Sequence, residues 1–185
     1  MIGTKRLVLR RWRDEDRAPY AALNADPEVM RHFPTTFTRA ESDAQVDRMD
    51  ARIDQEGFGL WAVEVVGGAP FIGFIGLAVL GFDAHFTPAV EVGWRLARAH
   101  WGHGYAPEGA AAALDLAFGD LLLDEVVSMT TTTNGNSQRV MQKLGMHRDP
   151  ADDFDHPTVP DGPLRRHVLY RIDADEWQPV SFSTQ

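Results

Sequence analysis

Apolar residues follow two different spacings along this chain, and the first of them predicts strands. Short alternating or continuously apolar runs indicate strands over residues 6–10, 60–66, 70–80, 89–96, 125–132 and 166–172. The pair Gly67-Gly68 joins the second and third of these as a hairpin. Gly73 and Gly76, inside the third strand, predict a bulge or a close approach of neighbouring backbone.

The second spacing, at i, i+3 and i+4, predicts helices together with the cap residues beside it. We expect them over residues 15–24, from Asp26-Pro27 to near His32, from the capping box Thr38-Arg39-Ala40-Glu41 to Gly57, over residues 107–118, and from Asn134 to Gly145. The helix at 107–118 carries a stripe expected to be buried, made of Ala110, Ala113, Leu114, Ala117, Phe118 and Leu121. Its alanines allow the helix to lie close to a sheet.

The order of these elements indicates an α/β fold. Without the short helix at 26–32 it reads β-α-α-β-β-β-α-β-α-β, which predicts a mixed sheet layered with helices. Residues 149–163 contain four prolines and five aspartates and predict a long loop. There is no repeat or linker, and 185 residues suit one core, so we expect a single domain over residues 1–185.

Composition excludes several classes of protein. Eighteen basic residues against 27 acidic ones give a net charge of −9, which argues against nucleic-acid binding. The chain has no cysteine, so disulfides, thiolate metal sites and a cysteine acyl-enzyme are excluded. Neither a secretory leader nor an apolar run of about 18 residues occurs, so we expect a cytoplasmic protein without membrane attachment.

Residues 101–108, Trp-Gly-His-Gly-Tyr-Ala-Pro-Glu, join the strand at 89–96 to the helix at 107–118. Gly102 and Gly104 let backbone N–H groups approach a ligand, and a helix start adds unpaired N–H groups and partial positive charge. Pro107 suits a first helical position. Such a turn is typical of a phosphate or pyrophosphate site, so we expect a phosphorylated cofactor here. The alternative is an ordinary strand-to-helix turn built from small residues.

Other motifs for phosphate binding or catalysis are absent. A dinucleotide fingerprint requires a third glycine where Pro107 stands, and neither a P-loop nor a Gly-x-Ser-x-Gly elbow occurs. His100 and His103 flank the glycine turn without a carboxylate cluster, so we expect no metal. A nicotinamide oxidoreductase stays open as an alternative, to be distinguished by stabilisation with NAD rather than CoA.

Three segments resemble the GNAT N-acetyltransferase superfamily, and specifically its RimJ/RimL-like branch. They are Val90 to Leu96, Trp101 to Ala106, and Asn134-x-x-Ser137 with the following Val140 to Met146. The resemblance implies a GNAT-like, mostly antiparallel mixed sheet flanked by helices. It also implies acetyl-CoA as donor and a primary amine as acceptor, either a protein N-terminus or a small molecule.

The resemblance assigns residues to the donor. Backbone N–H groups of Gly102 to Ala106 would hold the pyrophosphate, and the strand Trp94 to Leu96 would pair with the pantetheine. An N–H near Val92 or Gly93 would face the thioester carbonyl. The full expected set is Val92, Trp94, Arg95, Leu96, Trp101, Gly102, His103, Gly104, Tyr105, Ala106, Asn134, Ser137 and Met141. The alternative interpretation of Trp94 is a core residue, and that of Asn134 is a turn residue.

Two positions depart from the family pattern. Trp101 stands where many relatives have glutamine or arginine, so one pyrophosphate hydrogen bond must come from backbone or water. Met141 stands where many have a tyrosine general acid, which puts the tyrosine route in doubt. The missing tyrosine leaves open a non-catalytic acyl-CoA-binding module.

The acceptor nitrogen must be neutral to attack. Deprotonating an alkylammonium at pH 7 costs about 4 kcal/mol, so a lysine-like acceptor needs a general base. The candidate bases are Glu91, Asp155, His156 and His167, each of which also reads as a structural residue. Ser137 is the candidate donor to the leaving thiolate, or a helix cap. Without cysteine, we expect direct transfer in a ternary complex.

The acceptor pocket is expected from three loops, over residues 31–37, 81–88 and 149–163. Their phenylalanines, histidines and aspartates predict an aromatic, partly acidic cleft suited to a cationic amine. A homodimer is compatible with the strand edges.

Overall fold

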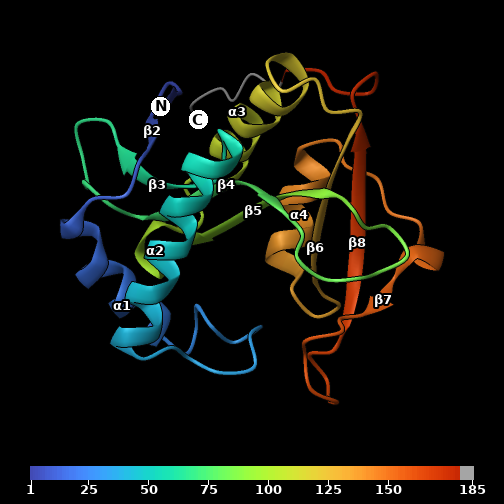
Figure 1. Ribbon diagram of the computed structural model, residues 1–185, viewed down its shortest axis with the longest axis horizontal. Coiled ribbons are helices and arrows are strands. Elements are labelled where there is room, and N and C mark those ends of the chain that lie inside the picture. The colour runs from blue at the N-terminus through green and yellow to red at the C-terminus, as the bar shows by residue number, and fades with distance from the viewer. Residues whose placement is uncertain (180–185) are drawn as a thin grey trace.

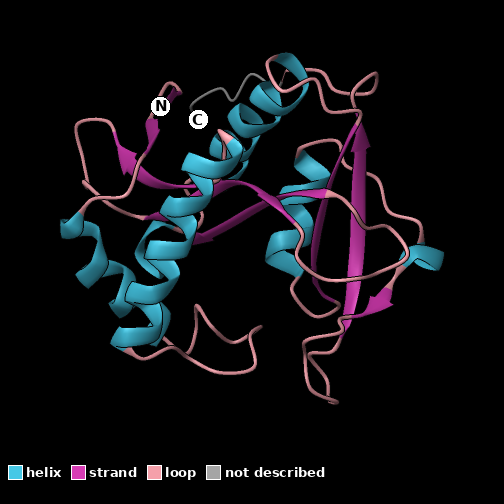
Figure 2. Ribbon diagram, in the orientation of Figure 1, coloured by secondary structure: helices cyan, strands magenta, loops and turns pink. Residues whose placement is uncertain are grey.

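The computed structural model describes residues 1–179 and contains one eight-stranded sheet (Figures 1 and 2). The strands are β1 (Ile2–Gly3), β2 (Leu7–Arg10), β3 (Leu60–Val65), β4 (Gly73–Val79), β5 (Val90–Leu96), β6 (Glu125–Thr131), β7 (Phe154–Asp155) and β8 (Arg166–Asp173). Their spatial order is β1-β2-β3-β4-β5-β6-β8-β7. Every neighbouring pair is antiparallel except β5 with β6. The expected mixed, mostly antiparallel α/β fold is confirmed.

The described residues form four α-helices, α1 (Arg17–Ala25), α2 (Arg39–Glu56), α3 (Tyr105–Gly119) and α4 (Gly135–Lys143). They also form three short 3-10 helices, η1 (Asp14–Asp16), η2 (Arg98–His100) and η3 (Pro150–Asp152). Helices α1 and α2 pack on each other, and α2 lies against β3. Helix α3 lies against β2, β4 and β5, and α4 lies beside β6 (Figure 1). Across residues 1–179, no helix combines the length and apolar character that a membrane span requires.

Strands β5 and β6 separate shortly after they meet. Their parallel pairing consists of one register pair, Glu91 with Val127. Beyond it, β5 runs across the sheet while β6 turns along β8 (Figure 1). A parallel pair is normally joined by evenly spaced hydrogen bonds along its length. The separation therefore leaves the later half of β5 with an open edge.

Glycine positions show where the backbone comes close. A Cβ on Gly76 would lie 2.1 Å from the Gly59 carbonyl oxygen, and one on Gly73 would lie 2.1 Å from that of Arg95. A Cβ on Gly109 would lie 2.5 Å from Ile75, so α3 sits directly on the sheet. The predicted close approaches in β4 are confirmed. Of the predicted α3 stripe, the alanines and Leu114 are buried, while Phe118 and Leu121 are half-buried.

Three sequence predictions need correction. The helix expected from Asp26-Pro27 to near His32 is wrong. After one turn, closed by the Met30 N–H on the Asp26 carbonyl at 3.0 Å, the segment continues as turns and bends, because it crosses to β6, where His32 Nδ1 lies 3.1 Å from Thr131 Oγ1. Pro107 is the third residue of α3 rather than the first, still within the turn where an N–H lacks a helical partner. The loop at 149–163 contains η3 and β7.

Candidate active site

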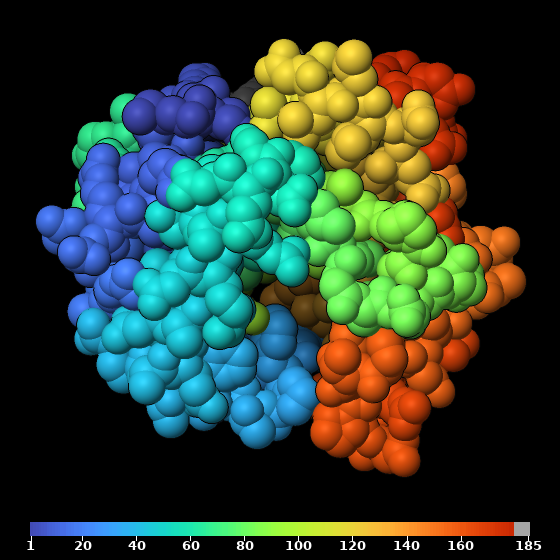
Figure 3. Space-filling view, viewed as in Figure 1, coloured from blue at the N-terminus to red at the C-terminus, as the bar shows by residue number. Residues whose placement is uncertain are grey.

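A cavity of about 700 Å³ occupies the space between β5, β6 and the segment that follows α1. Figure 3 shows it as a hollow near the centre of the molecule. Of the predicted site residues, those that line it are Glu91, Trp94, Arg95, Leu96, Trp101, Gly102, Gly104, Tyr105, Ala106, Asn134, Ser137, Met141, His156 and His167. Val92, His103 and Asp155 are not among the lining residues.

The glycine turn has the backbone shape of an anion site. Gly102 and Gly104 have φ of 78° and 76°, in the left-handed region that favours glycine. Gly104 is the N-cap of α3, and no side chain caps the helix there. The first-turn N–H groups of Tyr105 and Ala106 therefore have no helical partners. Such N–H groups, together with the positive end of the helix dipole, are suited to bind an anion.

A buried carboxylate holds this turn against the N-terminal strands. Glu108, 5% exposed, accepts hydrogen bonds from Arg6 Nε at 2.6 Å and from the Thr4 hydroxyl at 2.7 Å. Arg6 also donates through Nη1 to the His103 carbonyl at 2.9 Å. His103 itself is exposed and stacks on Tyr105, with ring centroids 5.5 Å apart. The turn is thus fixed from outside the cavity.

Side chains already bond to the backbone along the open edge of β5, so the backbone of one residue, Trp94, stays available there. The Val92 carbonyl accepts the Ser128 hydroxyl at 2.9 Å, and the Leu96 carbonyl accepts the Trp101 indole N–H at 2.8 Å. Backbone groups of alternate residues face the same side of a strand, so those of Trp94 face the opening as well. The Val92 side chain is fully buried. Gly93 alternates with Val92 and Trp94 along the strand, so its backbone groups face β4 instead.

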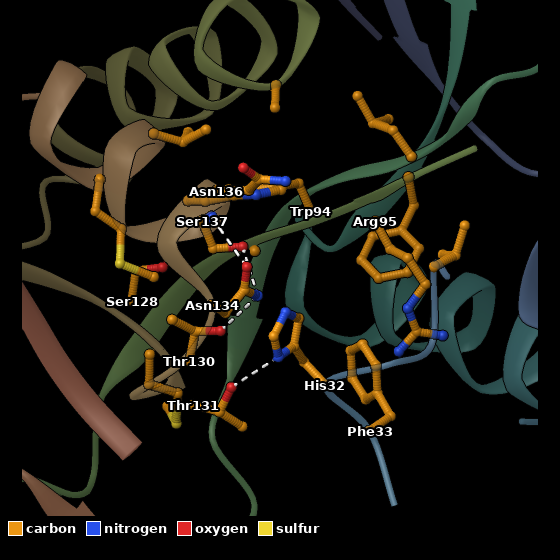
Figure 4. A pocket seen from close by; sticks show the side chains of 18 of the residues that line it. His32, Phe33, Trp94, Arg95, Ser128, Thr130, Thr131, Asn134, Asn136 and Ser137 are labelled. Carbon is orange, nitrogen blue, oxygen red and sulfur yellow. Dashed lines mark hydrogen bonds between the residues drawn. The ribbon is translucent and has the colours of Figure 1, made fainter. Parts of the chain in front are cut away.

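Asn134 organises the start of α4 (Figure 4). Its Oδ1 accepts the Ser137 backbone N–H at 3.2 Å, and its Nδ2 donates to Ser137 Oγ at 3.0 Å and Thr130 Oγ1 at 2.9 Å. Because Ser137 Oγ accepts from Asn134, its own proton is left to donate. Met141, 1% exposed, completes the wall.

Replacing Asn134 by alanine should lower the free energy of unfolding by about 1 kcal/mol, the usual cost of losing a helix N-cap. Chemical denaturation with a circular dichroism readout measures this. Asn136→Ala, two positions later and outside the cap, serves as the control. Equal stability of the Asn134 variant and the wild type would contradict the assigned capping role.

Glu91 is the titratable group best placed on the open strand. It lies at the single point where β5 meets β6, and its carboxyl carbon leans over Gly93, 3.9 Å from where a Cβ would stand. Burial raises the pKa of Glu91 to about 7, although a backbone hydrogen bond from Met129 offsets part of the rise. A carboxylate with this pKa suits proton transfer at neutral pH.

The other candidate bases differ from Glu91. His156 and His167 lie with ring centroids 5.0 Å apart, and burial lowers the pKa of both, that of His156 to about 4. Both are therefore neutral at pH 7 and His156 is a weak base. Asp155 is exposed and forms an ion pair with Arg166 at 3.3 Å.

The cleft is partly acidic, but its carboxylates do not come from the loop that the sequence indicated. The aspartates of the 149–163 loop are held outside it, Asp152 by Arg171 and Asp153 by Arg148. Phe86 and Phe154 are buried in a small separate apolar cluster. The charged side chains that do line the cavity are the carboxylates Glu28 and Glu91 and the cations Arg31, Arg95, Arg139 and Lys143.

The sequence placed the loop 31–37 at the pocket but did not single out His32, which lines the cavity. His32 comes from the segment after α1, and its Nδ1 lies 3.1 Å from Thr131 Oγ1 at the end of β6 (Figure 4). This contact ties the segment across the mouth of the cavity. A histidine within a segment expected to be helical gave no signal for it, because the partner is 99 residues away.

Comparisons with known proteins agree with this geometry. A family model described as an acetyltransferase (GNAT) domain matches residues 6–147. The FsC-acetyl coenzyme A-N(2)-transacetylase of Aspergillus fumigatus is 33% identical over 183 residues, covering 95% of this chain and 77% of that protein. The structure of a GNAT-family acetyltransferase from Bacillus anthracis superposes with a TM-score of 0.78 at 24% identity, covering 95% of this chain and 99% of that chain. RimJ of Mycobacterium smegmatis, in complex with CoA-disulfide, gives a TM-score of 0.71 at 20% identity, covering 92% and 83%.

These findings define the class of the protein as an acyltransferase. The chain belongs to the GNAT acetyltransferase family. It is an N-acetyltransferase of that family, as the RimJ/RimL-like resemblance predicted, and the family uses acyl-CoA donors.

Proposed function

We propose that this protein transfers an acetyl group from acetyl-CoA to a primary amine, directly within a ternary complex. One observation carries the proposal: the glycine turn, the open edge at Trp94 and the carboxylate of Glu91 all border one cavity. An acetyl-CoA molecule bound along the glycine turn and the open edge would place its thioester near Glu91.

The donor side of the cavity fits acetyl-CoA. The two glycines hold left-handed backbone conformations that a residue with a Cβ would strain, and this backbone shape presents N–H groups to the proposed diphosphate. Arg139 and Lys143 on α4 line the same cavity and add positive charge for the nucleotide phosphates. The Trp94 backbone offers one donor and one acceptor to the amides of the pantetheine. The indole of Trp101 is committed to Leu96, so phosphate contacts at this end come from the backbone.

Glu91 acts as the general base, in contact with the amine directly or through one water. It takes a proton from the acceptor ammonium, and the neutral nitrogen then attacks the thioester carbonyl carbon. When the carbon–sulfur bond breaks, the thiolate receives the proton that Ser137 Oγ is free to donate. The attacking nitrogen loses its second proton in the same collapse, and this proton restores the Ser137 hydroxyl. Glu91 keeps only the proton of the ammonium and releases it to solvent before the next turnover. The products are the N-acetyl amide and CoA. His156 and His167 remain neutral and shape the acceptor end of the cavity.

Release of CoA thiol, followed with a thiol reagent, tests this function against a panel of primary amines and N-terminal peptides. Amine-dependent release and an N-acetylated product by mass spectrometry are expected. A non-catalytic acyl-CoA-binding module would instead be stabilised by acetyl-CoA, by about 2.7 kcal/mol at a hundredfold excess over Kd, without amine-dependent release. Stabilisation by NAD and none by CoA would refute the donor as well.

Replacing Ser137 by alanine should lower kcat by about tenfold, the worth of one hydrogen bond to a charged group. The stability should change little, because the cap of α4 uses the backbone N–H of residue 137. Steady-state rates at saturating acetyl-CoA measure the effect, and Ser137→Thr, which keeps the hydroxyl, is the matched control. An unchanged kcat in the alanine variant would remove Ser137 from the reaction.

A further inference from the structure

Arg95 on β5 is a buried cation that lacks an anionic partner. It is 8% exposed and lines the cavity. Its Nη1 donates to the neutral amide oxygen of Asn24 at 2.7 Å, while its Nε has no hydrogen-bond partner. Within residues 1–179, no carboxylate forms an ion pair with it. Burial lowers its pKa, which shows that its surroundings disfavour the charge.

The contrast with Arg10 shows that this is unusual for the chain. Arg10 is 3% exposed, and it pairs with Asp16 at 2.7 Å and Glu64 at 2.9 Å. Removing a charge from water is costly unless a partner compensates it. Carboxylates of this protein thus neutralise the charge of Arg10 but not that of Arg95.

Aromatic rings surround the Arg95 guanidinium, and two of them, Phe33 and Phe74, line the cavity with it. Its central carbon lies 4.2 Å from the ring centroid of Phe33, 5.5 Å from Phe74 and 5.7 Å from Phe37. Such rings stabilise a cation but do not satisfy its N–H donors. They hold the planar group in place with unused donors, and Figure 4 shows it beside Phe33 at the wall of the pocket.

Arg95 and Glu91 share one face of β5, because side chains alternate along a strand. Four residues of strand separate their Cα atoms by about 13 Å. Gly93 lies between them and has no side chain, so the floor of the cavity is open along this line. A ligand lying there would meet the proposed base at one end and the unpaired guanidinium at the other.

We propose that Arg95 binds a carboxylate of the acceptor, so that the acceptor is a small ω-amino carboxylate whose amine and carboxylate are several bonds apart. The proposal rests on the acetyltransferase function proposed above and names the acceptor class of that site. A guanidinium suits this role because it can bind a carboxylate through two parallel hydrogen bonds. The rings around Arg95 carry no charge, so the carboxylate of the acceptor would be its one charged partner.

Initial rates of CoA release should be measured for ω-amino carboxylates with two to seven methylenes, and for alkylamines and α,ω-diamines of equal length. In the wild type, the best carboxylate should have a kcat/KM at least about tenfold above its length-matched alkylamine and diamine, as expected for a charged hydrogen bond. In Arg95→Gln this ratio should fall to near one. Arg39→Gln removes an exposed arginine paired with Asp43 at 2.8 Å and should keep the wild-type ratio.

A second measurement distinguishes loss of carboxylate binding from misfolding of the variant. Hexanoate, which has the carboxylate but no amine, should raise the melting temperature of the wild-type CoA complex, and hexanamide should not. Arg95→Lys keeps the charge without the planar fork and should show a weakened hexanoate shift. Loss of the shift in Arg95→Gln and its weakening in Arg95→Lys, with CoA-induced stabilisation intact, support carboxylate binding by Arg95.

The outcomes separate the two proposals. If no amine causes CoA release, the proposed acetyl transfer fails, and the hexanoate shift still decides whether Arg95 binds a carboxylate. If amines are acetylated but no chain length favours the carboxylate, the proposal for Arg95 is overturned alone. A preference that persists in Arg95→Gln overturns it as well.

Discussion

Replacing Glu91 by glutamine should lower kcat/KM for an alkylamine acceptor by about 100- to 10,000-fold, the range that general base catalysis contributes. The amide keeps the size of the side chain but cannot take a proton. The effect should be smaller for an α-amino acceptor, whose lower pKa makes its neutral form less costly. Steady-state kinetics with both acceptor types measure the difference.

The pH dependence gives the sharper test of Glu91. Burial raises the pKa of Glu91 to about 7, so the fraction in the active, ionised form rises as pH increases through 7. The wild-type kcat/KM should follow this ionisation, and the Glu91→Gln profile should lack it. His156→Gln is the control, because that histidine is neutral throughout this range and its loss leaves the ionisation near 7 in place.

Stability should move in the opposite direction to activity. Because the folded-state pKa of Glu91 lies above its ordinary value of 4.5, the folded state binds more protons than the unfolded state between about pH 4.5 and 7. The contribution of Glu91 to stability is therefore lost as pH rises through 7. Glu91→Gln should be at least as stable as the wild type at pH 8, and a marked loss of stability there would indicate a structural role instead.

Replacing Gly102 by valine should raise the Kd for CoA by about 100-fold or more. At φ of 78° a β-branched residue is strained, so the turn would rearrange and direct its N–H groups away from the diphosphate. Losing two hydrogen bonds to a charged group, at about 1.5–3 kcal/mol each, accounts for the size of the effect. Isothermal titration calorimetry with CoA measures it.

The chain offers a matched control in Gly67→Val. Gly67 has φ of 68°, and a Cβ added at Gly67 or at Gly102 would have no heavy atom within 4 Å. Gly67 differs in its location, because it lies in the β3–β4 hairpin, away from the cavity. Both variants should lose a similar amount of stability, roughly 1–2 kcal/mol, the cost of a side chain in the left-handed region. Equal CoA affinity in the two variants would refute diphosphate binding at the turn.

Where local chemistry decides an element, the sequence predicted it well. Thr38 accepts the Glu41 N–H, Glu41 accepts that of Thr38, and Gly57 ends α2 with φ of 78°. Asn134 caps α4 through its side chain as well. These signals need only residues three or four positions apart, and the six main strands follow from apolar runs that are equally local.

Predictions failed where distant partners decide. The pair Asp26-Pro27 predicts a helix start, but its segment crosses to Thr131 through His32 and stays in turns. The aspartates after residue 148 predict an acidic cleft, but Asp152 and Asp153 pair with arginines outside it. A single sequence does not show which opposite charge each carboxylate will meet.

The sequence by itself determined the order of the main strands and helices and the glycine turn, because periodicity, caps and glycine geometry act between neighbouring residues. It indicated the family through the resemblance of three motif segments. Only the tertiary structure decided that β5 and β6 part after Glu91, that burial raises the pKa of this carboxylate, and that Arg95 is left without a carboxylate. The physical reason is that burial and charge compensation depend on which distant residues the fold brings together.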